Sequence, residues 1–398
     1  MSGLGFKMFD TDNHYYETTD AFTRHMDPRM APRAIQWAEI DGETRMVVGG
    51  KIFQFFLSPT NDPTWKPGVS REIIRGNNPE GLDWLEVEND LAPSRPEFRN
   101  RDARLALMDQ QGIEGIFSFP SLGMGIEQAL SGDPEACMAA FQAFNRWLDE
   151  DWGFDYDDRI YAAPYISLLD PDGAIKELEW ALERGARIVT MRPGPIAGPG
   201  HNRSPGDPIF DGFWARVNEA DIVVGYHGAD TIYHQYLSDW GQSENMYENA
   251  HMALLLDMFK RTQRDTFVAL ICHGVFKRFP NLRILAVENG SDWVPSLLQE
   301  LSRVFRMLPQ SFTEDPAETF LRHCWMSCTP FLSDDLPELR EQIGVDRILM
   351  GSDYPHPEGL ENPADFVKEL DGFGDDEIRM IMRENGLGLV KPSASPTL

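Results

Sequence analysis

The feature that most constrains the fold is a repeated alternation of short apolar runs and helical segments along most of the chain. Alternating strands and helices imply parallel strands joined by right-handed crossovers. Eight such units in 398 residues predict a closed (β/α)8 TIM barrel. A doubly wound open sheet is the alternative, but no Gly-rich phosphate loop follows the first strand. The predicted strands are centred near Asp10, Ile116, Tyr161, Ile188, Val223, Ile284, Met326 and Leu349.

Residues 15–97 interrupt this alternation after the first strand, and we interpret them as an insertion rather than a domain. Within them, the stretch 45–53 (RMVVGGKIF) has two apolar runs around Gly-Gly, which predicts a β-hairpin. The stretch 59–97 is rich in Pro, Gly, Asn and Asp and predicts a long surface excursion, and such insertions often act as lids. Residues 1–390 are expected to form one barrel unit. The Pro- and Ser-rich tail 391–398 is expected to be flexible.

The helical segments have recognisable start and stop signals. A helix is predicted from Asn100 to Gln111, where Gly112 stops it, and another from Asp133 to Asp151, where Asp-Pro begins it. Two further helices are predicted over 250–260 and 265–278.

Charge and composition exclude some classes of partner. The chain carries 36 basic and 64 acidic residues, a net charge of -28, which argues against nucleic acid or an anionic membrane as the main partner. No apolar run is long enough to span a membrane, and the first residues do not form a signal peptide, so we expect a cytoplasmic protein. The four cysteines form no C-x-x-C pair. A small-molecule substrate and a homodimer, the commonest symmetric assembly, are the expected partners.

Asp10, Asp12 and His14 alternate at the end of the first predicted strand. Side chains two residues apart in a strand share one face, so two carboxylates and an imidazole would form half of a divalent-metal site. Considered alone, the same residues are better explained as a polar turn after the strand.

Other strand ends strengthen the metal interpretation. Active-site residues of such barrels come from the carboxyl ends of the strands, and a structural protein has little use for so many charges buried at one mouth. The polar residues at the carboxyl ends of the predicted strands are Arg192 after the fourth strand, His227 after the fifth, Glu288 after the sixth, and Asp353 and His356 after the eighth.

Taken together, four motifs resemble the amidohydrolase superfamily, and within it the amidohydrolase-2 branch that includes aminocarboxymuconate-semialdehyde decarboxylase-like proteins. The resemblance extends over most of the chain. The motifs lie at 10–17 (DTDNHYYE), 274–282 (GVFKRFPNL), 288–295 (ENGSDWVP) and 351–356 (GSDYPH).

The resemblance implies one divalent metal ion. The residues carried over as ligands are Asp12, His14, His227 and Asp353. Asp12 departs from the family pattern, because many relatives have His there. Zinc is the expected ion, with manganese or iron(II) as alternatives. Binuclear relatives use a carboxylated Lys on the fourth strand, where this chain has Met-Arg, so a mononuclear site is implied.

The same resemblance implies roles for the remaining candidates. Asp353 would take a proton from a metal-activated water and return it to a leaving group. Glu288 stands where relatives often have His, and is a candidate second acid/base or a partner of His227. Arg192 would bind a substrate carboxylate, although a salt bridge at the barrel rim is an equal alternative. His356 would either line the pocket or face solvent.

The sequence therefore predicts a metal-dependent hydrolase acting on a small carboxylate-bearing organic substrate. Non-oxidative decarboxylation of an aromatic or unsaturated carboxylic acid is the alternative reaction at the same site. A non-catalytic, metal-stabilised binding protein is the alternative from another class, and the density of carboxylates at the strand ends speaks against it.

Overall fold

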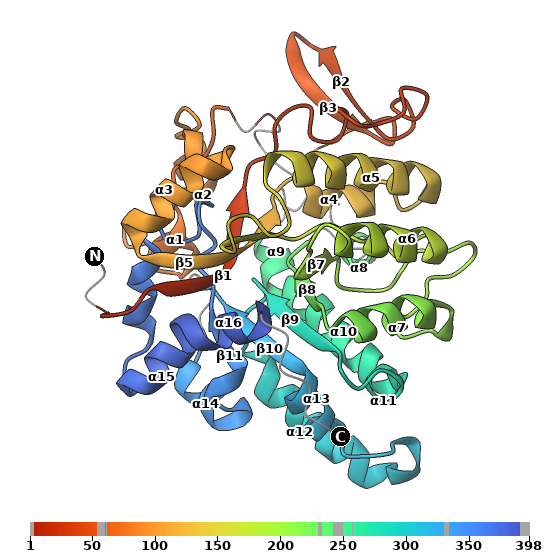
Figure 1. Ribbon diagram of the computed structural model, residues 1–398, viewed down its shortest axis with the longest axis vertical. Helices are drawn as coiled ribbons and strands as arrows, with labels where there is room; N and C mark the ends of the chain where they lie inside the picture. The colour runs from red at the N-terminus through yellow and green to blue at the C-terminus, as the bar shows by residue number, and fades with distance from the viewer. Residues whose placement is uncertain are drawn as a thin grey trace.

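The computed structural model describes residues 4–53, 60, 62–229, 233–241, 250–256, 258–329 and 334–390. The predicted tail 391–398 lies outside them. The fold is a mixed α/β fold with parallel sheets, in which Figure 1 shows helices arranged around central strands. Eight strands of the described chain form these sheets: β1 (Met8–Tyr15), β5 (Ile113–Pro120), β6 (Ile160–Ala162), β7 (Ile188–Met191), β8 (Val223–His227), β9 (Arg283–Val287), β10 (Cys324–Cys328) and β11 (Ile348–Met350).

These strands form two parallel sheets, β1-β5-β6 and β7-β8-β9-β10-β11, and each strand pairs with its neighbour in chain order. Backbone hydrogen bonds also join the two sheets to each other. On one side, Thr190 of β7 bridges to Tyr165, which follows β6. On the other, the His14 N–H donates to the Tyr354 carbonyl (2.7 Å), just beyond β11. All eight predicted strands are therefore present, and their carboxyl ends lie at one end of the sheets.

The alternation of side chains along the strands explains why they are buried on both faces. Ile188, Val223 and Leu285 belong to an inner apolar cluster, whereas their neighbours Val189 and Val224 belong to the larger cluster that packs under the helices. Successive strand residues point to opposite faces, so each strand contributes to both cores. The inner cluster also receives side chains from the C-terminal helix α16 (Asn385–Val390).

Helices pack outside the strands. α3 (Arg101–Gln111) and α5 (Pro134–Asp151) begin one residue after the predicted starts, because the side chains of Asn100 and Asp133 cap them by accepting hydrogen bonds from the Ala103 and Ala136 N–H groups. The remaining α-helices are α1 (Arg71–Ile74), α2 (Trp84–Glu88), α4 (Gly123–Ala129), α6 (Pro171–Leu182), α7 (Asp211–Ala220), α8 (His234–Asp239), α9 (Ala250–Leu255), α10 (Met258–Cys272), α11 (Val275–Arg278), α12 (Trp293–Met307), α13 (Pro316–His323), α14 (Leu336–Ile343) and α15 (Asp375–Arg379), besides α3 (Arg101–Gln111) and α5 (Pro134–Asp151).

Helix boundaries differ from the prediction between 250 and 278. The structure has α9, a long α10 and the short α11 there, so the predicted break near 260–265 lies inside α10. None of the described helices is long and apolar enough to cross a membrane.

The insertion after β1 carries a small antiparallel sheet of β2 (Ile35–Ile40), β3 (Glu43–Val48) and β4 (Lys51–Ile52). β3 and β4 pair around Gly49 and Gly50, whose positive φ angles of 58° and 77° suit a tight turn. Further along, the Gly68 and Ser70 N–H groups donate to the His356 and Pro357 carbonyls. The insertion thus contacts the loop that follows β11.

Candidate metal centre

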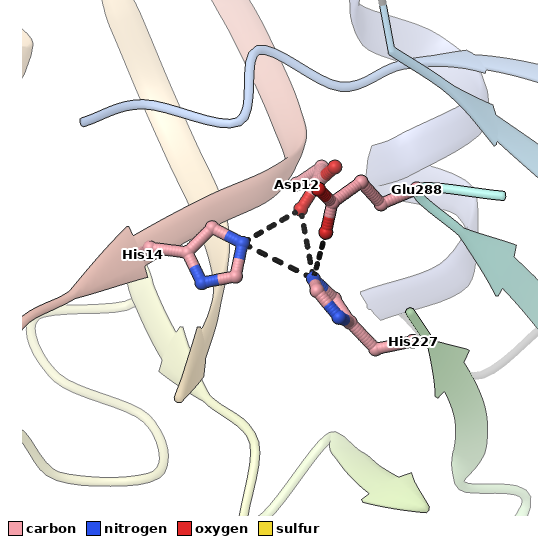
Figure 2. Close-up of side chains that lie close together, drawn as sticks. All are labelled: Asp12, His14, His227 and Glu288. Atoms are coloured by element: carbon pink, nitrogen blue, oxygen red, sulfur yellow. Dashed lines mark hydrogen bonds and ion pairs between the residues drawn. The ribbon is translucent and has the colours of Figure 1, made fainter. Parts of the chain in front are cut away.

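Four side chains from three strand ends converge on one point, as Figure 2 shows. Asp12 and His14 lie on β1, His227 is the last residue of β8, and Glu288 directly follows β9. One donor atom from each lies within 4.8 Å of the others. The Nε2 atom of His227 is 3.1 Å from His14 Nε2 and 3.2 Å from Glu288 Oε2. Asp12 Oδ1 is 3.3 Å from His14 Nε2 and 3.5 Å from His227 Nε2.

The hydrogen-bond chemistry of these atoms fits a cation. His227 Nδ1 lies 2.8 Å from the Gly228 carbonyl, which can only accept, so Nδ1 carries the hydrogen and Nε2 keeps its lone pair. That lone pair faces the carboxylate oxygens of Asp12 and Glu288. Asp12 Oδ1 is buried without a hydrogen-bond donor in the described part of the chain, while Oδ2 accepts from Thr329. Acceptors that face one another are stable when a positive charge lies between them, and two imidazoles with carboxylates suit a divalent transition metal.

Asp353 lies beside this group on the loop after β11. Its side chain is fully buried, and within the described residues neither carboxylate oxygen accepts a hydrogen bond. Asp353 Oδ1 is 3.3 Å from His14 Nε2 and 2.7 Å from His356 Nδ1. Both Glu288 and Asp353 have φ angles of 56°, a left-handed conformation that non-glycine residues adopt at a cost of about 1–3 kcal/mol. Such strain persists where function requires a particular side-chain position.

Burial shapes the charge state of these groups. It raises the pKa of Glu288 and of Asp353 well above the usual carboxyl range, and nearby negative charges raise both further. It also lowers the pKa of His14 well below its ordinary value. Burial alone would raise the pKa of Asp12, but its contacts with His14 and His227 outweigh that effect and lower it. A bound cation would have the opposite effect on Glu288 and Asp353. It would lower the pKa of both carboxyls, because it stabilises their ionised form.

Asp10 lies apart from the groups of candidate ligands. Its carboxylate accepts hydrogen bonds from the Ser352 N–H (2.9 Å), the Ser352 hydroxyl (2.5 Å) and the Asn13 amide (2.9 Å). These contacts connect β1 to the segment after β11 and so support the positions of Asp12 and Asp353.

Arg192 is buried and has contacts of its own. Its guanidinium donates to Gln128 Oε1 (3.0 Å) and to the Pro195 carbonyl (2.8 Å), and Nε lies 3.6 Å from Glu127 Oε1. The contact with Glu127 is a salt bridge, as in the alternative role that the sequence analysis gave for Arg192. Its predicted role in substrate binding stays a prediction.

Sequence reasoning did not single out two residues at this site. Glu358 lies with Glu288, Asp353 and His356 in a second group whose donor atoms are within 4.8 Å of one another. Ser121, directly after β5, has its hydroxyl 2.8 Å from His356 Nε2. The strand-end rule applied to β5 would have found Ser121, whereas Glu358 carries no local signal beyond following the GSDYPH motif by two residues.

Fold and site together define an α/β protein with parallel strands whose carboxyl ends carry a group of residues able to hold a metal ion. The family model described as amidohydrolase matches residues 18–389. The chain is 43% identical to the amidohydrolase map2389c of Mycobacterium avium subsp. paratuberculosis, with a TM-score of 0.91 over 97% of this chain and 100% of the other. The protein therefore belongs to the amidohydrolase family, whose members are metal-dependent enzymes.

Two more distant structures share the fold. A dihydroxybenzoic acid decarboxylase of Polaromonas sp. JS666, solved with manganese and 2-nitroresorcinol, has 16% identity and a TM-score of 0.62 over 97% of each chain. A manganese-bound 5-carboxyvanillate decarboxylase of Novosphingobium aromaticivorans has 15% identity and a TM-score of 0.55 over 98% of each chain. The fold is thus shared with decarboxylases as well as with an amidohydrolase.

Proposed function

We propose that this protein is a metal-dependent hydrolase acting on a small, carboxylate-bearing organic substrate. The observation that carries the proposal is the convergence of Asp12, His14, His227 and Glu288, whose facing nitrogen and oxygen atoms could hold a cation. We further infer that the two sheets act as one closed (β/α)8 barrel, because hydrogen bonds connect them at both edges.

The proposed ligands are Asp12, His14 and His227, with Asp353 and Glu288 beside them. Zinc, manganese and iron(II) all suit nitrogen and carboxylate donors. When bound, such an ion acidifies a coordinated water and polarises a carbonyl group of the substrate. The manganese in the two decarboxylase structures makes manganese a strong candidate here.

Asp353 is the proposed general base. Its oxygens are free of hydrogen-bond donors among the described residues, so either can accept a proton from water. A cation at the centre keeps Asp353 ionised, because it offsets the burial that otherwise raises the pKa of this carboxyl. Asp353 would then return the proton to the leaving group. Glu288 is the proposed second acid/base, and Arg192 and His356 are the proposed substrate-binding residues.

Decarboxylation of an aromatic or unsaturated acid is a second candidate. The observation that favours it is the fold shared with two decarboxylases. Hydrolysis incorporates an oxygen atom from water into the product, whereas decarboxylation releases carbon dioxide. The products therefore distinguish the two reactions.

The first test is elemental analysis of the purified protein after reconstitution with zinc, manganese or iron(II). We expect a tightly held divalent ion in the wild type and its loss in the double variant Asp12→Ala/His227→Ala. The matched control is Asp346→Ala/His201→Ala, which changes the same residue types at exposed positions. A wild type that holds no metal under any condition would overturn the proposal.

The second test follows turnover of small amides, esters, lactones and aromatic acids in water labelled with oxygen-18. Labelled product without carbon dioxide supports hydrolysis. Carbon dioxide without label supports the second candidate instead.

A further inference from the structure

We propose that a second divalent cation binds beside the first, held by Glu288, Asp353, His356 and Glu358. One donor atom from each of these residues lies within 4.8 Å of the others. The inference rests on the proposed metal site, because Glu288 belongs to both groups. The centre would then take two metal ions, without the carboxylated lysine that the sequence comparison led us to expect in a binuclear site.

The hydrogen bonds of His356 leave it ready to act as a ligand. The Ser121 hydroxyl donates its single hydrogen to the Tyr15 carbonyl (3.0 Å), so it can only accept from His356 Nε2, 2.8 Å away. Nε2 therefore carries the imidazole hydrogen of a neutral His356, and Nδ1 keeps its lone pair. This is the arrangement in which an outer hydrogen bond fixes the tautomer of a metal-bound histidine.

The lone pair on His356 Nδ1 faces an oxygen. Asp353 Oδ1 lies 2.7 Å from it, so two acceptors approach each other. Such an approach is repulsive unless a proton or a cation compensates it. Asp353 Oδ2 is also buried without a hydrogen-bond partner among the described residues. Asp353 thus directs an unpartnered, fully buried carboxylate into the proposed site.

The position of the shared carboxylates fits two adjacent ions. Glu288 contributes an oxygen 3.2 Å from His227 Nε2 in the first group, and it also belongs to the second. Asp353 likewise lies 3.3 Å from His14 Nε2 while it contacts His356. A carboxylate has two oxygens, so Glu288 can contribute one oxygen to each of two adjacent ions, whereas both of these Asp353 contacts are made by Oδ1.

The charge balance supports the same conclusion. Glu288, Asp353 and Glu358 form a group of three carboxyls, and the printed partners of Glu288 and Asp353 in the described chain are histidines, not Lys or Arg. One divalent ion near Asp12 and the two histidines leaves this second group of negative charges uncompensated.

The donor set also indicates the class of ion. The second group offers three carboxylates and one imidazole, whereas the first offers two imidazoles and two carboxylates. Oxygen-rich sites favour harder ions such as manganese(II) or magnesium over zinc. Manganese(II) is therefore the suitable probe.

The experiment titrates the metal-free full chain with manganese(II) alone and measures bound metal by equilibrium dialysis and electron paramagnetic resonance. We expect two ions per wild-type chain and a spectrum broadened by coupling between neighbouring ions. Glu358→Gln, which removes one charge at a partly exposed position, should bind one ion and give the spectrum of isolated manganese. Glu361→Gln, an exposed glutamate in the same loop, should still bind two.

The possible failures are distinguishable. A wild type that saturates at one ion with an uncoupled spectrum would overturn the second site and leave the first intact. Two ions in Glu358→Gln, with the coupled spectrum unchanged, would overturn the assignment of Glu358 and its group. A wild type that binds no manganese would overturn both this inference and the proposed function.

Discussion

At the scale of single residues, Asp353 combines several unusual properties. It has a left-handed backbone, it is fully buried, and neither of its oxygens accepts a hydrogen bond in the described chain. None of these features stabilises the fold, and together they cost free energy. They are reasonable for a residue with the proposed role of exchanging a proton beside a cation.

We therefore predict that Asp353→Asn lowers kcat by about 10²–10⁴-fold, because an amide of the same size cannot accept a proton. The measurement is steady-state turnover of the substrate that the screen identifies, with manganese saturating. Asp346→Asn, at an exposed position, is the control. Unchanged kcat in Asp353→Asn would contradict the role of general base.

A second prediction concerns Asp334, outside the metal centre. Asp334 Oδ1 accepts hydrogen bonds from the Ser291 N–H and hydroxyl, and burial raises the pKa of this carboxyl from 3.8 to about 6. The folded state therefore holds a proton that the unfolded state releases, so the free energy of unfolding falls as the pH rises from about 4 to 6. The total effect is about 3 kcal/mol.

The corresponding experiment is urea denaturation of the wild type and Asp334→Asn between pH 4 and pH 8. The asparagine cannot ionise. Between pH 4 and pH 7 the wild type should therefore lose about 3 kcal/mol of unfolding free energy relative to Asp334→Asn. Parallel pH profiles of the two proteins would show that Asp334 has an ordinary pKa.

At the scale of elements, the close approach of β1 and β11 positions the site. A Cβ atom added at Gly351, just after β11, would lie 2.6 Å from Asp12 Cβ and 2.7 Å from Ser327 Oγ. The lack of a side chain at Gly351 therefore lets the segment after β11 lie directly against Asp12.

We predict that Gly351→Ala destabilises the fold by about 1–3 kcal/mol and weakens manganese binding, because Asp12 must move. Denaturation and metal titration measure the two effects. Gly132→Ala is the control, since a Cβ there meets nothing within 4 Å. If Gly351→Ala binds manganese as tightly as the wild type, this packing does not position Asp12.

The helices show where local patterns were insufficient. α3 and α5 begin at readable caps, but α4 contains two glycines near its start and was not predicted. The carboxylate of Glu17 accepts hydrogen bonds from the Leu122 and Gly123 N–H groups at the beginning of α4. α4 is therefore stabilised by a contact with a residue far away in the sequence, which no local propensity records.

At the scale of the whole molecule, the proposed metal connects strands from both ends of the chain, since its ligands run from Asp12 to Asp353. A ligand that binds only the folded state stabilises it. We predict that manganese at 100 times its dissociation constant raises the unfolding free energy by about 2.7 kcal/mol. Thermal or urea denaturation with manganese or with a chelator measures this.

The double variant Asp12→Ala/His227→Ala should show no such stabilisation, and Asp346→Ala/His201→Ala should respond as the wild type does. Equal stability of the wild type with manganese and with chelator would count against a metal centre in the folded protein.

Sequence periodicity located the eight strands, and the polar residues at their ends predicted that Asp12, His14, His227, Glu288 and Asp353 lie at one edge, whereas their roles as ligands and acid/base groups stay predictions. That succeeded because the side-chain period of a strand is local, and because parallel strands bring their carboxyl ends together. Tertiary structure decided the rest. It paired Asp10 with Ser352, surrounded Arg192 with Glu127 and Gln128, and brought Glu358 to Glu288. These four contacts join residues 64 to 342 positions apart, and at such separations only the packed strands determine which side chains meet.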